Sequence, residues 1–228
     1  MKSKIIIALV FSLLIGFFLY QKNEKNPPNF VLIYIDDLGY GDFGLHQDNR
    51  LKTPAINKLM SNGQTWTDFY TSASVCSPSR GALLTGNLPV RSGLYGDRLA
   101  VLWPGSKTGM PSEQLTIAEE FKEHDYLTGM FGKWHLGDAN EFLPTRHGFD
   151  EWFGIPYSND MDWTIGEITS TNINSDLSAS AEKWKKVGGV YQKRLRNPNL
   201  SDWNVPLIQS QLNLDGTYKD NIIERPAD

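Results

Sequence analysis

Apolar runs alternate with polar stretches along the chain, and the longest uncharged run lies near the N-terminus. Residues 5–20 make up sixteen positions without a charge. Residues 30–35, which read FVLIYI, are continuously apolar and rich in β-branched side chains. This second pattern predicts a strand buried on both faces of a parallel sheet. Residues 65–70 and 126–131 predict two further strands.

Helix signals separate the predicted strands. Residues 53–63 predict a helix that begins at a threonine–proline pair and ends near a glycine. Residues 77–86 predict a second helix, which begins at a serine–proline pair. A capping-box pattern at 116–119 predicts a third, which runs to about residue 124. The order of these elements predicts an α/β layer fold.

These signals weaken from about residue 157 onward. Asparagine, serine, aspartate and lysine dominate there, with scattered tryptophans at 163, 184 and 203. We expect an irregular insertion rather than a second compact domain. The pattern therefore divides the chain into an N-terminal segment, residues 1–26, and one domain, residues 27–228.

The N-terminal segment has the pattern of an export signal. Two lysines precede the uncharged run 5–20, as in the basic and apolar regions of a signal peptide. The run is slightly shorter than the roughly 20 residues of a membrane span. Residues 1–26 therefore predict a signal peptide or an N-terminal membrane anchor plus linker. We expect an exported protein that is periplasmic, extracellular or membrane-anchored through residues 5–20.

Composition and charge exclude several classes of protein. A hydrophobic fraction of 40% in 228 residues excludes a polytopic membrane protein, and 12% aromatic residues exclude a disordered chain. Four lysines and one glutamate give residues 1–26 a charge of +3, so the other 202 residues carry −7 of the total of −4. This acidic body argues against a nucleic-acid-binding module. With Cys76 as the single cysteine, an intramolecular disulfide is impossible.

A pair of carboxylates forms the first candidate chemical group. Asp36 and Asp37 directly follow the predicted strand 30–35. Ligands of parallel α/β sheets bind beyond the carboxyl ends of strands. Two adjacent carboxylates there offer oxygen ligands to a hard cation such as Ca²⁺ or Mg²⁺. A solvated turn or a helix cap is the alternative interpretation.

A cysteine and an arginine form the second group. Cys76 lies just before the predicted helix 77–86, and the positive N-terminal end of a helix favours anions and activated nucleophiles. Arg80 is one turn further on and is expected to reach the same anion. The spacing excludes the Cys-x5-Arg loop of phosphatases, because Ala82 stands where that loop needs arginine. The alternative is a small buried cysteine beside a surface arginine.

Lys133 and His135 form the third group, directly after the predicted strand 126–131. Residues two apart in an extended segment face the same side. An ammonium group and an imidazole there would bind an anion and move a proton. The alternative is a polar loop that Trp134 anchors to the core. Together the three groups predict hydrolysis of an anionic ester at a site with a hard metal.

Four segments resemble the signature segments of type I sulfatases and occur in that family's order. Residues 76–80 (CSPSR) match the Cys-x-Pro-x-Arg signature, which residues 81–86 (GALLTG) extend. The other segments are residues 35–42 (IDDLGYGD), 132–137 (GKWHLG) and 147–154 (HGFDEWFG). The resemblance is to the arylsulfatase A and N-acetylgalactosamine-6-sulfatase branch and covers about residues 29–160.

The resemblance implies a fold and a reaction. The implied fold is alkaline-phosphatase-like, with a mostly parallel central sheet flanked by helices. The implied reaction is hydrolysis of sulfate esters, aryl or sugar, by a formylglycine nucleophile. A separate formylglycine-generating maturation enzyme would make this aldehyde from Cys76.

The resemblance also implies a role for each candidate residue. The implied metal ligands are Asp36, Asp37 and residue 76, holding Ca²⁺ in preference to Mg²⁺, and the implied catalytic residues are Cys76, Arg80, Lys133 and His135. Arg80 would stabilise the hydrated aldehyde. Lys133 would bind a sulfate oxygen, and His135 would help to deprotonate the hydroxyl in the elimination step.

The chain is short for the family that it resembles. In that family the remaining metal ligands, a second histidine and a second lysine lie further along the sequence. We therefore expect residues 27–228 to be a truncated N-terminal catalytic domain, with an under-coordinated cation, weak stability and no activity by itself. Two alternatives stay open: a formylglycine-dependent phosphonate or phosphate ester hydrolase of the same superfamily, and an inactive membrane-tethered remnant.

Overall fold

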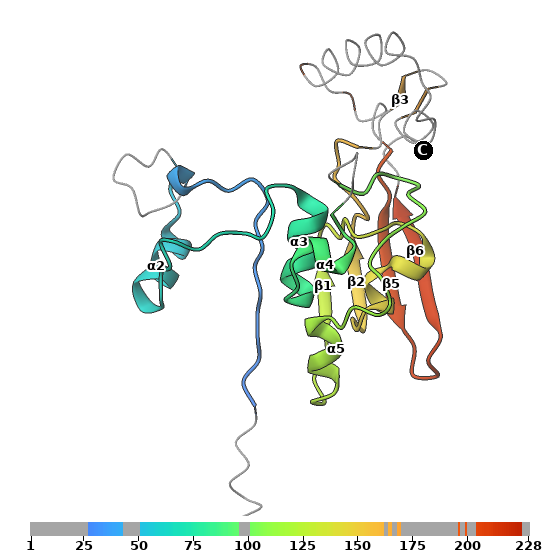
Figure 1. Ribbon diagram of the computed structural model, residues 1–228, viewed down its shortest axis with the longest axis horizontal. Helices are drawn as coiled ribbons and strands as arrows, with labels where there is room; N and C mark the ends of the chain where they lie inside the picture. The colour runs from blue at the N-terminus through green and yellow to red at the C-terminus, as the bar shows by residue number, and fades with distance from the viewer. Residues whose placement is uncertain are drawn as a thin grey trace, which may run out of the picture. The chain divides into compact units, whose positions relative to one another are not determined.

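The structure is a computed structural model of the chain. It describes residues 27–42, 51–95, 101–161 and 204–224, with short pieces at 164–165, 168–169, 196 and 199. These residues belong to two compact units, Met1–Gln64 and Thr65–Asp228, which we describe separately with the labels of Figure 1. The predicted export segment 1–26 lies outside the described residues. Among the helices of the described part, none combines the length and apolarity that a membrane span requires.

In the first unit, the predicted helix is confirmed and the predicted strand is wrong. Helix α2 spans Pro54–Asn62, after a short 3-10 helix η1 (Tyr40–Asp42). Residues 30–35 are exposed along their whole length, with Val31 at 85%. A strand needs a hydrogen-bonded neighbour, and none of the strands in the described part of the chain pairs with this run. Residues 30–35 are therefore apolar in sequence but exposed, and they join no strand of the described part of the chain.

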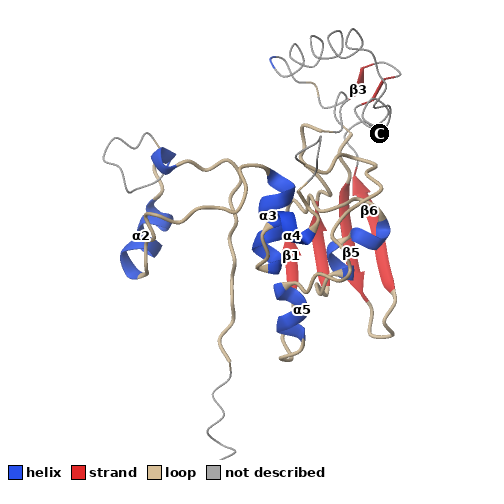
Figure 2. Cartoon of the chain, viewed as in Figure 1, coloured by secondary structure: helices blue, strands red, loops and turns tan. Residues whose placement is uncertain are grey.

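In the second unit, short helices lie on one side of a sheet (Figure 2). The α-helices are α3 (Cys76–Thr85), α4 (Pro89–Ser92) and α5 (Ile117–Lys122), and the 3-10 helices are η2 (Asn140–Phe142) and η3 (Pro144–Arg146). The predicted helix 77–86 is confirmed as α3. It ends at Gly86, whose φ of +66° suits glycine and whose N–H donates to the Ala82 carbonyl.

The capping box predicted for the third helix is also confirmed. The Glu119 N–H donates to Thr116 Oγ1 (3.2 Å), and the Thr116 N–H donates to Glu119 Oε2 (2.7 Å). Thr116 is fully buried, and its hydroxyl also donates to the His147 carbonyl (2.8 Å). The cap therefore fixes the start of α5 to the segment that precedes strand β2.

The main sheet contains four strands in the order β1-β2-β5-β6. They are β1 (Gly129–Phe131), β2 (Glu151–Gly154), β5 (Leu207–Leu212) and β6 (Tyr218–Glu224). Strands β1 and β2 are parallel, whereas β2–β5 and β5–β6 are antiparallel. Strands β3 (Thr164–Ile165) and β4 (Ile168–Thr169) form a separate antiparallel pair. The α/β class is thus confirmed, with a mixed sheet in the described residues.

The second unit corrects three sequence predictions. Residues 65–70 contain a turn instead of the predicted strand. The strand predicted at 126–131 is confined to its last three residues, β1. Residues 204–224, expected to be irregular, form the hairpin β5–β6, which turns at Gly216 with φ +81°. The three tryptophans at 163, 184 and 203 lie outside the described residues.

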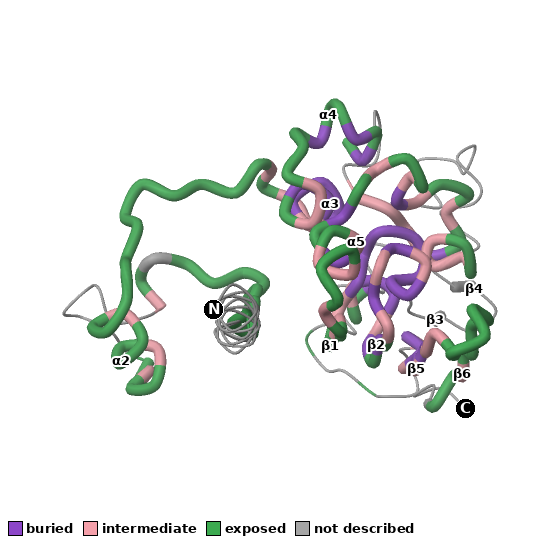
Figure 3. The backbone as a smooth tube through the Cα atoms, turned by 90° about the horizontal axis from the view of Figure 1, so that it is seen from below, coloured by how far each residue is buried: buried purple, intermediate pink, exposed green. Residues whose placement is uncertain are grey.

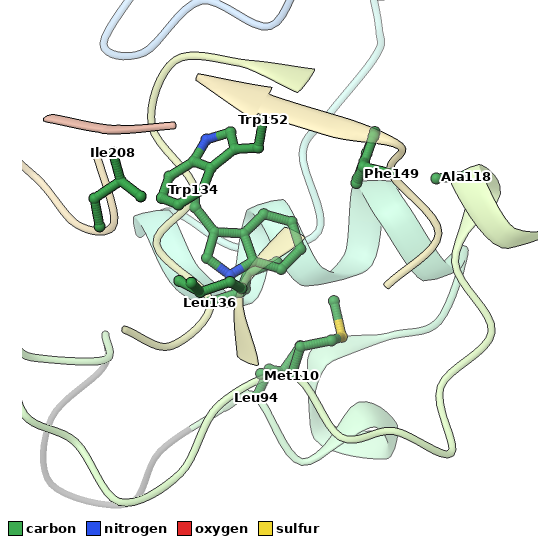
Figure 4. Close-up of a cluster of buried hydrophobic side chains, with 9 residues drawn as sticks. Leu94, Met110, Ala118, Trp134, Leu136, Phe149, Trp152 and Ile208 are labelled. Atoms are coloured by element: carbon green, nitrogen blue, oxygen red, sulfur yellow. The ribbon is translucent and has the colours of Figure 1, made fainter. Parts of the chain in front are cut away.

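The core lies between the helices and the sheet (Figures 3 and 4). Its buried members are Leu94, Met110, Ala118, Trp134, Leu136, Leu143, Phe149, Trp152 and Ile208. The two tryptophans are fully buried, and each indole N–H has a main-chain partner. Trp134 donates to the Phe142 carbonyl (2.7 Å) and Trp152 to the Gly132 carbonyl (3.1 Å). Trp134 thus anchors the 132–137 loop to the core, as the alternative interpretation of this segment expected.

Candidate active site

Cys76 is the first residue of α3. Val75 precedes it with extended backbone angles (φ −128°, ψ 159°), so the chain enters the helix at Cys76. Gly81 lets the helix approach Leu94 closely, because a Cβ at position 81 would lie 2.2 Å from Leu94 Cδ1. Cys76 is half-buried and forms no disulfide. It therefore lies in the first turn of α3, where unpaired main-chain N–H groups create a positive potential.

The loop that carries Lys133 and His135 extends the ladder between β1 and β2. Main-chain N–H groups of Gly132, Trp134 and His135 donate to the carbonyls of Phe153, Ile155 and Pro156, each at 2.9 Å. Gly132 has a φ of +106°, a conformation that favours glycine. The loop also approaches β2 very closely, since a Cβ on Gly154 would lie 1.9 Å from the Gly132 carbonyl oxygen.

Three of the predicted catalytic residues lie together in the second unit. Lys133 Nζ is 3.6 Å from Cys76 Sγ. Arg80, on the next turn of α3, donates from Nη1 to the Lys133 carbonyl at 2.6 Å. The arginine thus ties α3 to the loop after β1 and places two side-chain cations near the thiol. This arrangement suits an anion that binds beside residue 76.

His135 is buried and has a defined tautomer. Its Nε2 lies 2.9 Å from the Leu102 carbonyl, and only 1% of the residue is exposed. A carbonyl only accepts hydrogen bonds, so Nε2 carries the proton and the lone pair of the neutral ring is on Nδ1. His135 has a φ of +63°, so the extended geometry predicted for residues 133–135 ends at this residue.

Asp36 and Asp37 belong to the first unit. They form an exposed turn directly after residues 30–35, and Asp37 has a φ of +57°. Among the described residues, no three histidine, cysteine, aspartate or glutamate side chains are grouped as a metal centre. The assignment of Asp36, Asp37 and residue 76 as metal ligands stays a prediction.

His147 packs against the loop 132–137 through its contact with Trp134. His147 is 2% exposed and stacks on Trp134, with 6.0 Å between ring centroids. Burial lowers its pKa, Glu119 opposes this effect and Arg146 adds to it. Among the described residues, neither ring nitrogen of His147 has a hydrogen-bond partner. His147 belongs to the matched segment 147–154, but no sequence pattern predicted a role for its side chain.

Asp150 connects α5, β1 and β2. It accepts from Lys122 Nζ (2.6 Å) and from the Thr128 N–H (2.8 Å). Burial by itself raises the pKa of Asp150, but the hydrogen bonds from Lys122 and Thr128 outweigh it and hold the pKa below its ordinary value. Asp150 is therefore a charged anchor for the scaffold, at the start of β2.

The sequence model of the sulfatase family matches residues 28–204. Human arylsulfatase A is 52% identical over 137 residues, which are 59% of this chain and 26% of that protein. The N-acetylgalactosamine-6-sulfatase of Canis lupus familiaris is 33% identical over 204 residues, which are 88% of this chain and 38% of that protein.

A solved structure agrees with these sequence matches. The crystal structure of Ps i-CgsB aligns with a TM-score of 0.50 and 36% identity, over 54% of this chain and 27% of that chain. The chain thus spans well under half the length of the relatives that it matches. The match of 28–204 includes all four signature segments. The chain belongs to the sulfatase family, and both the predicted family and its alkaline-phosphatase-like α/β fold are confirmed.

Proposed function

We propose that the second unit carries the nucleophile and anion-binding side of a site that hydrolyses sulfate esters. The contact between Lys133 Nζ and Cys76 Sγ supports this proposal most directly. A lysine so placed neutralises a sulfate oxygen while residue 76 attacks the sulfur. The N-terminal end of α3 and the Arg80 guanidinium add positive potential at the same place.

The reaction proceeds in two steps once a maturation enzyme has oxidised Cys76 to formylglycine. The hydrated aldehyde has two hydroxyls on one carbon. One hydroxyl attacks sulfur and loses its proton, the S–O bond to the alcohol breaks, and the alcohol leaves with a proton. His135 then takes the proton of the second hydroxyl, the bond between carbon and the sulfate oxygen breaks, and sulfate leaves as the aldehyde reforms.

The hydrogen bonding of the buried His135 ring fits the role of a base. Its Nε2–H points at the Leu102 carbonyl, so Nδ1 is the nitrogen that takes the proton. Burial keeps the ring from exchanging partners with bulk water. The role of Arg80 is to hold the Lys133 backbone and to stabilise the hydrated aldehyde.

A hard cation completes the proposed site. The carboxylates Asp36 and Asp37 have the oxygen-donor chemistry that Ca²⁺ prefers, and residue 76 adds an oxygen after maturation. These three residues supply fewer than the roughly 6–8 ligands of Ca²⁺, so further ligands are needed from outside the set. When bound, such a cation polarises the sulfate and favours the ionised nucleophile. The ligand chemistry favours Ca²⁺ over Mg²⁺, which requires stricter geometry.

The proposed substrate is a sulfate ester of an aryl or sugar alcohol. Two of the matched relatives are an arylsulfatase and an N-acetylgalactosamine-6-sulfatase. Ps i-CgsB has also been solved in complex with k-i-k-neocarrahexaose. We further propose that residues 1–26 direct export and that the protein meets its maturation enzyme on that route.

The proposal is tested first by maturation and sulfate binding. The chain is produced together with a formylglycine-generating enzyme, and the peptide containing residue 76 is analysed by mass spectrometry. We expect the aldehyde at position 76 and binding of inorganic sulfate, which Lys133→Ala weakens. Lys107→Ala, which changes an exposed lysine, is the matched control. Unmodified Cys76, or sulfate binding that Lys133→Ala leaves unchanged, would contradict the proposal.

A paired assay then separates the two enzyme classes. Aryl sulfate and aryl phosphonate are offered to the matured chain with Ca²⁺. Preference for the sulfate supports the proposal, and preference for the phosphonate supports the alternative hydrolase of the same superfamily. Because residues 27–228 are expected to show no turnover by themselves, preference is measured as competition with bound inorganic sulfate, and Lys133→Ala is expected to weaken binding of aryl sulfate by about tenfold or more.

A further inference from the structure

We infer that Ser77 is a positioning residue for His135 and acts through the main chain of Leu102. This inference rests on the proposed function, in which His135 moves a proton. Ser77 Oγ accepts from the Leu102 N–H at 2.9 Å. The Leu102 carbonyl then accepts from His135 Nε2 at 2.9 Å. One residue of the intervening loop thus links the helix of the nucleophile to the histidine.

Both ends of this link are shielded from water. Ser77 is fully buried and His135 is 1% exposed. Leu102 itself packs against the main hydrophobic core. A main-chain N–H left without a partner in such a place is destabilising, because it has lost its bond to water. The Ser77 hydroxyl therefore holds the main chain of Leu102 in place, because it is the hydrogen-bond acceptor for the Leu102 N–H.

The loop around Leu102 is held at other points as well. The Trp103 N–H donates to Ser106 Oγ (3.0 Å), and the Gly105 N–H donates to Asp138 Oδ2 (2.7 Å). The first bond closes a turn within residues 103–106, and the second ties this turn to Asp138, three residues after His135. Ser77 ties Leu102 to α3, so the Leu102 carbonyl has a defined position for the imidazole.

The conformation of His135 explains why it needs such support. A non-glycine residue at φ +63° is strained and persists only where the surroundings hold it. The His135 N–H donates to the Pro156 carbonyl at 2.9 Å, and the ring donates to Leu102. The main-chain bond fixes the backbone, whereas the Leu102 bond selects the Nε2–H tautomer and leaves the Nδ1 lone pair as the base.

The Cys-x-Pro-x-Arg motif does not specify a serine at position 77. In the Cys-x-Pro-x-Arg signature, residue 77 occupies the first unspecified position. Its role comes from contacts with residues 25 and 58 positions further along the chain, the first direct and the second through Leu102. The structure thus assigns a specific task to a position whose neighbour Cys76 carries the chemistry.

An isosteric pair of variants tests the inference. Ser77→Thr keeps the hydroxyl, and Ser77→Val replaces it with a methyl group of the same shape. The readout is the ¹⁵N–¹H spectrum of the His135 imidazole, which reports the tautomer. We expect wild type and Ser77→Thr to show the Nε2–H form. In Ser77→Val the ratio of Nε2–H to Nδ1–H is expected to fall about fivefold or more, because the Leu102 carbonyl is displaced.

Ser92 provides a matched control for Ser77, because it is also a buried serine near α3 in the sequence. Ser92→Ala removes another buried hydroxyl, which donates to the Pro89 carbonyl in α4 (3.1 Å), and is expected to leave the His135 spectrum unchanged. An unchanged Nε2–H tautomer in Ser77→Val would overturn the inference, as would an equal change in Ser92→Ala. If Ser77→Val does not fold, Ser77→Ala takes its place.

The readout separates this inference from the proposed function. The tautomer of His135 is measured without maturation of Cys76, Ca²⁺ or turnover. A tautomer change in Ser77→Val together with no sulfate binding in wild type would retain the positioning role and reject the proposed function. Sulfate binding together with an unchanged tautomer would do the reverse.

Discussion

Two apolar runs precede candidate site residues, and only one of them pairs with another strand in the described part of the chain. Residues 30–35 precede Asp36 and Asp37 and are exposed throughout, whereas β1 precedes Lys133 and pairs with β2 in a sheet. In β2, Trp152 is fully buried and its indole N–H reaches the loop after β1. An apolar pattern therefore predicts a strand only where the fold offers an edge to pair with.

The two units also differ in how their helices begin. Thr53 precedes α2, and its hydroxyl donates to Asn57 Oδ1 (3.1 Å). Thr116 precedes α5 and takes part in a capping box while its hydroxyl donates to the His147 carbonyl. The same residue type at the same position is thus a local feature in one unit and a tertiary contact in the other.

Replacing one apolar side chain in each region is expected to produce the largest contrast. Trp152→Ala should lower the free energy of unfolding by about 3–5 kcal/mol, because it opens a cavity and removes the bond to the Gly132 carbonyl. Leu32→Ala, at a position that is 62% exposed, should change it by less than about 0.5 kcal/mol. Urea unfolding followed by circular dichroism measures both values. Equal losses would show that residues 30–35 are buried in solution.

The threonine caps should differ by a smaller amount. Thr116→Ala is expected to cost about 1–2 kcal/mol, because it removes the cap and leaves the His147 carbonyl without its partner. Thr53→Ala is expected to cost only a few tenths of a kcal/mol, because its hydroxyl bonds a side chain on the helix surface. Urea midpoints at a common slope give the comparison. A larger loss for Thr53→Ala would reverse the ranking of the two units.

An ion pair provides a weaker test. Lys122 and Asp150 are each about one-third exposed, so a double-mutant cycle with Lys122→Met and Asp150→Asn should give a coupling of about 0.5–1 kcal/mol. Lys58→Met in α2 is the control in the first unit and is expected to change stability by less than about 0.5 kcal/mol. A coupling near zero would show that the contact between Lys122 and Asp150 contributes nothing to the scaffold.

The smallest expected effect is a dependence of stability on pH. Burial lowers the pKa of His147 below 6.5, its ordinary value, so the unfolded chain binds the proton more readily. Stability from this group is complete above pH 6.5 and falls as the pH drops from 6.5 toward the lower folded pKa. His147→Gln should flatten the curve in this range, and the exposed His124→Gln should not. A curve that His124→Gln flattens and His147→Gln leaves unchanged would show that His147 is not the titrating group.

Local signals account for the elements that the sequence predicted well. The capping box at Thr116 and the left-handed glycine at position 86 act within one turn of helix, so their residues suffice to locate α5 and α3. The same holds for the grouping of Cys76 and Arg80, which are one turn apart on α3. The family segments then identified Lys133 as a third member, at 3.6 Å from the thiol.

The hairpin β5–β6 escaped prediction because its buried face is partly polar. Ser210 is fully buried, and its hydroxyl contacts Thr145 Oγ1 (2.7 Å) and Asp220 Oδ1 (2.5 Å). Arg146 in turn binds the Asp220 carboxylate with two nitrogens. Serine at an inward position breaks the apolar alternation that predicts a strand. The partners that satisfy it lie far away in sequence.

Long-range contacts also explain what was missed in the site. The link from Ser77 to His135 passes through Leu102, and neither contact has a sequence pattern. The left-handed conformation of His135 was equally hidden, because histidine adopts positive φ more often than most residues but still only rarely. The exposure of residues 30–35 depends on which strands are available for pairing, and this is a property of the fold rather than of the run itself.

The close approach at Gly154 has a consequence for inheritance. Every missense change of a glycine codon introduces a side chain, and at position 154 even a methyl group would overlap the Gly132 carbonyl oxygen. The loop that holds Lys133 and His135 would have to move away from β2. A survey of alleles in natural populations should therefore find this codon altered only by synonymous changes, although it encodes no chemical group of the site.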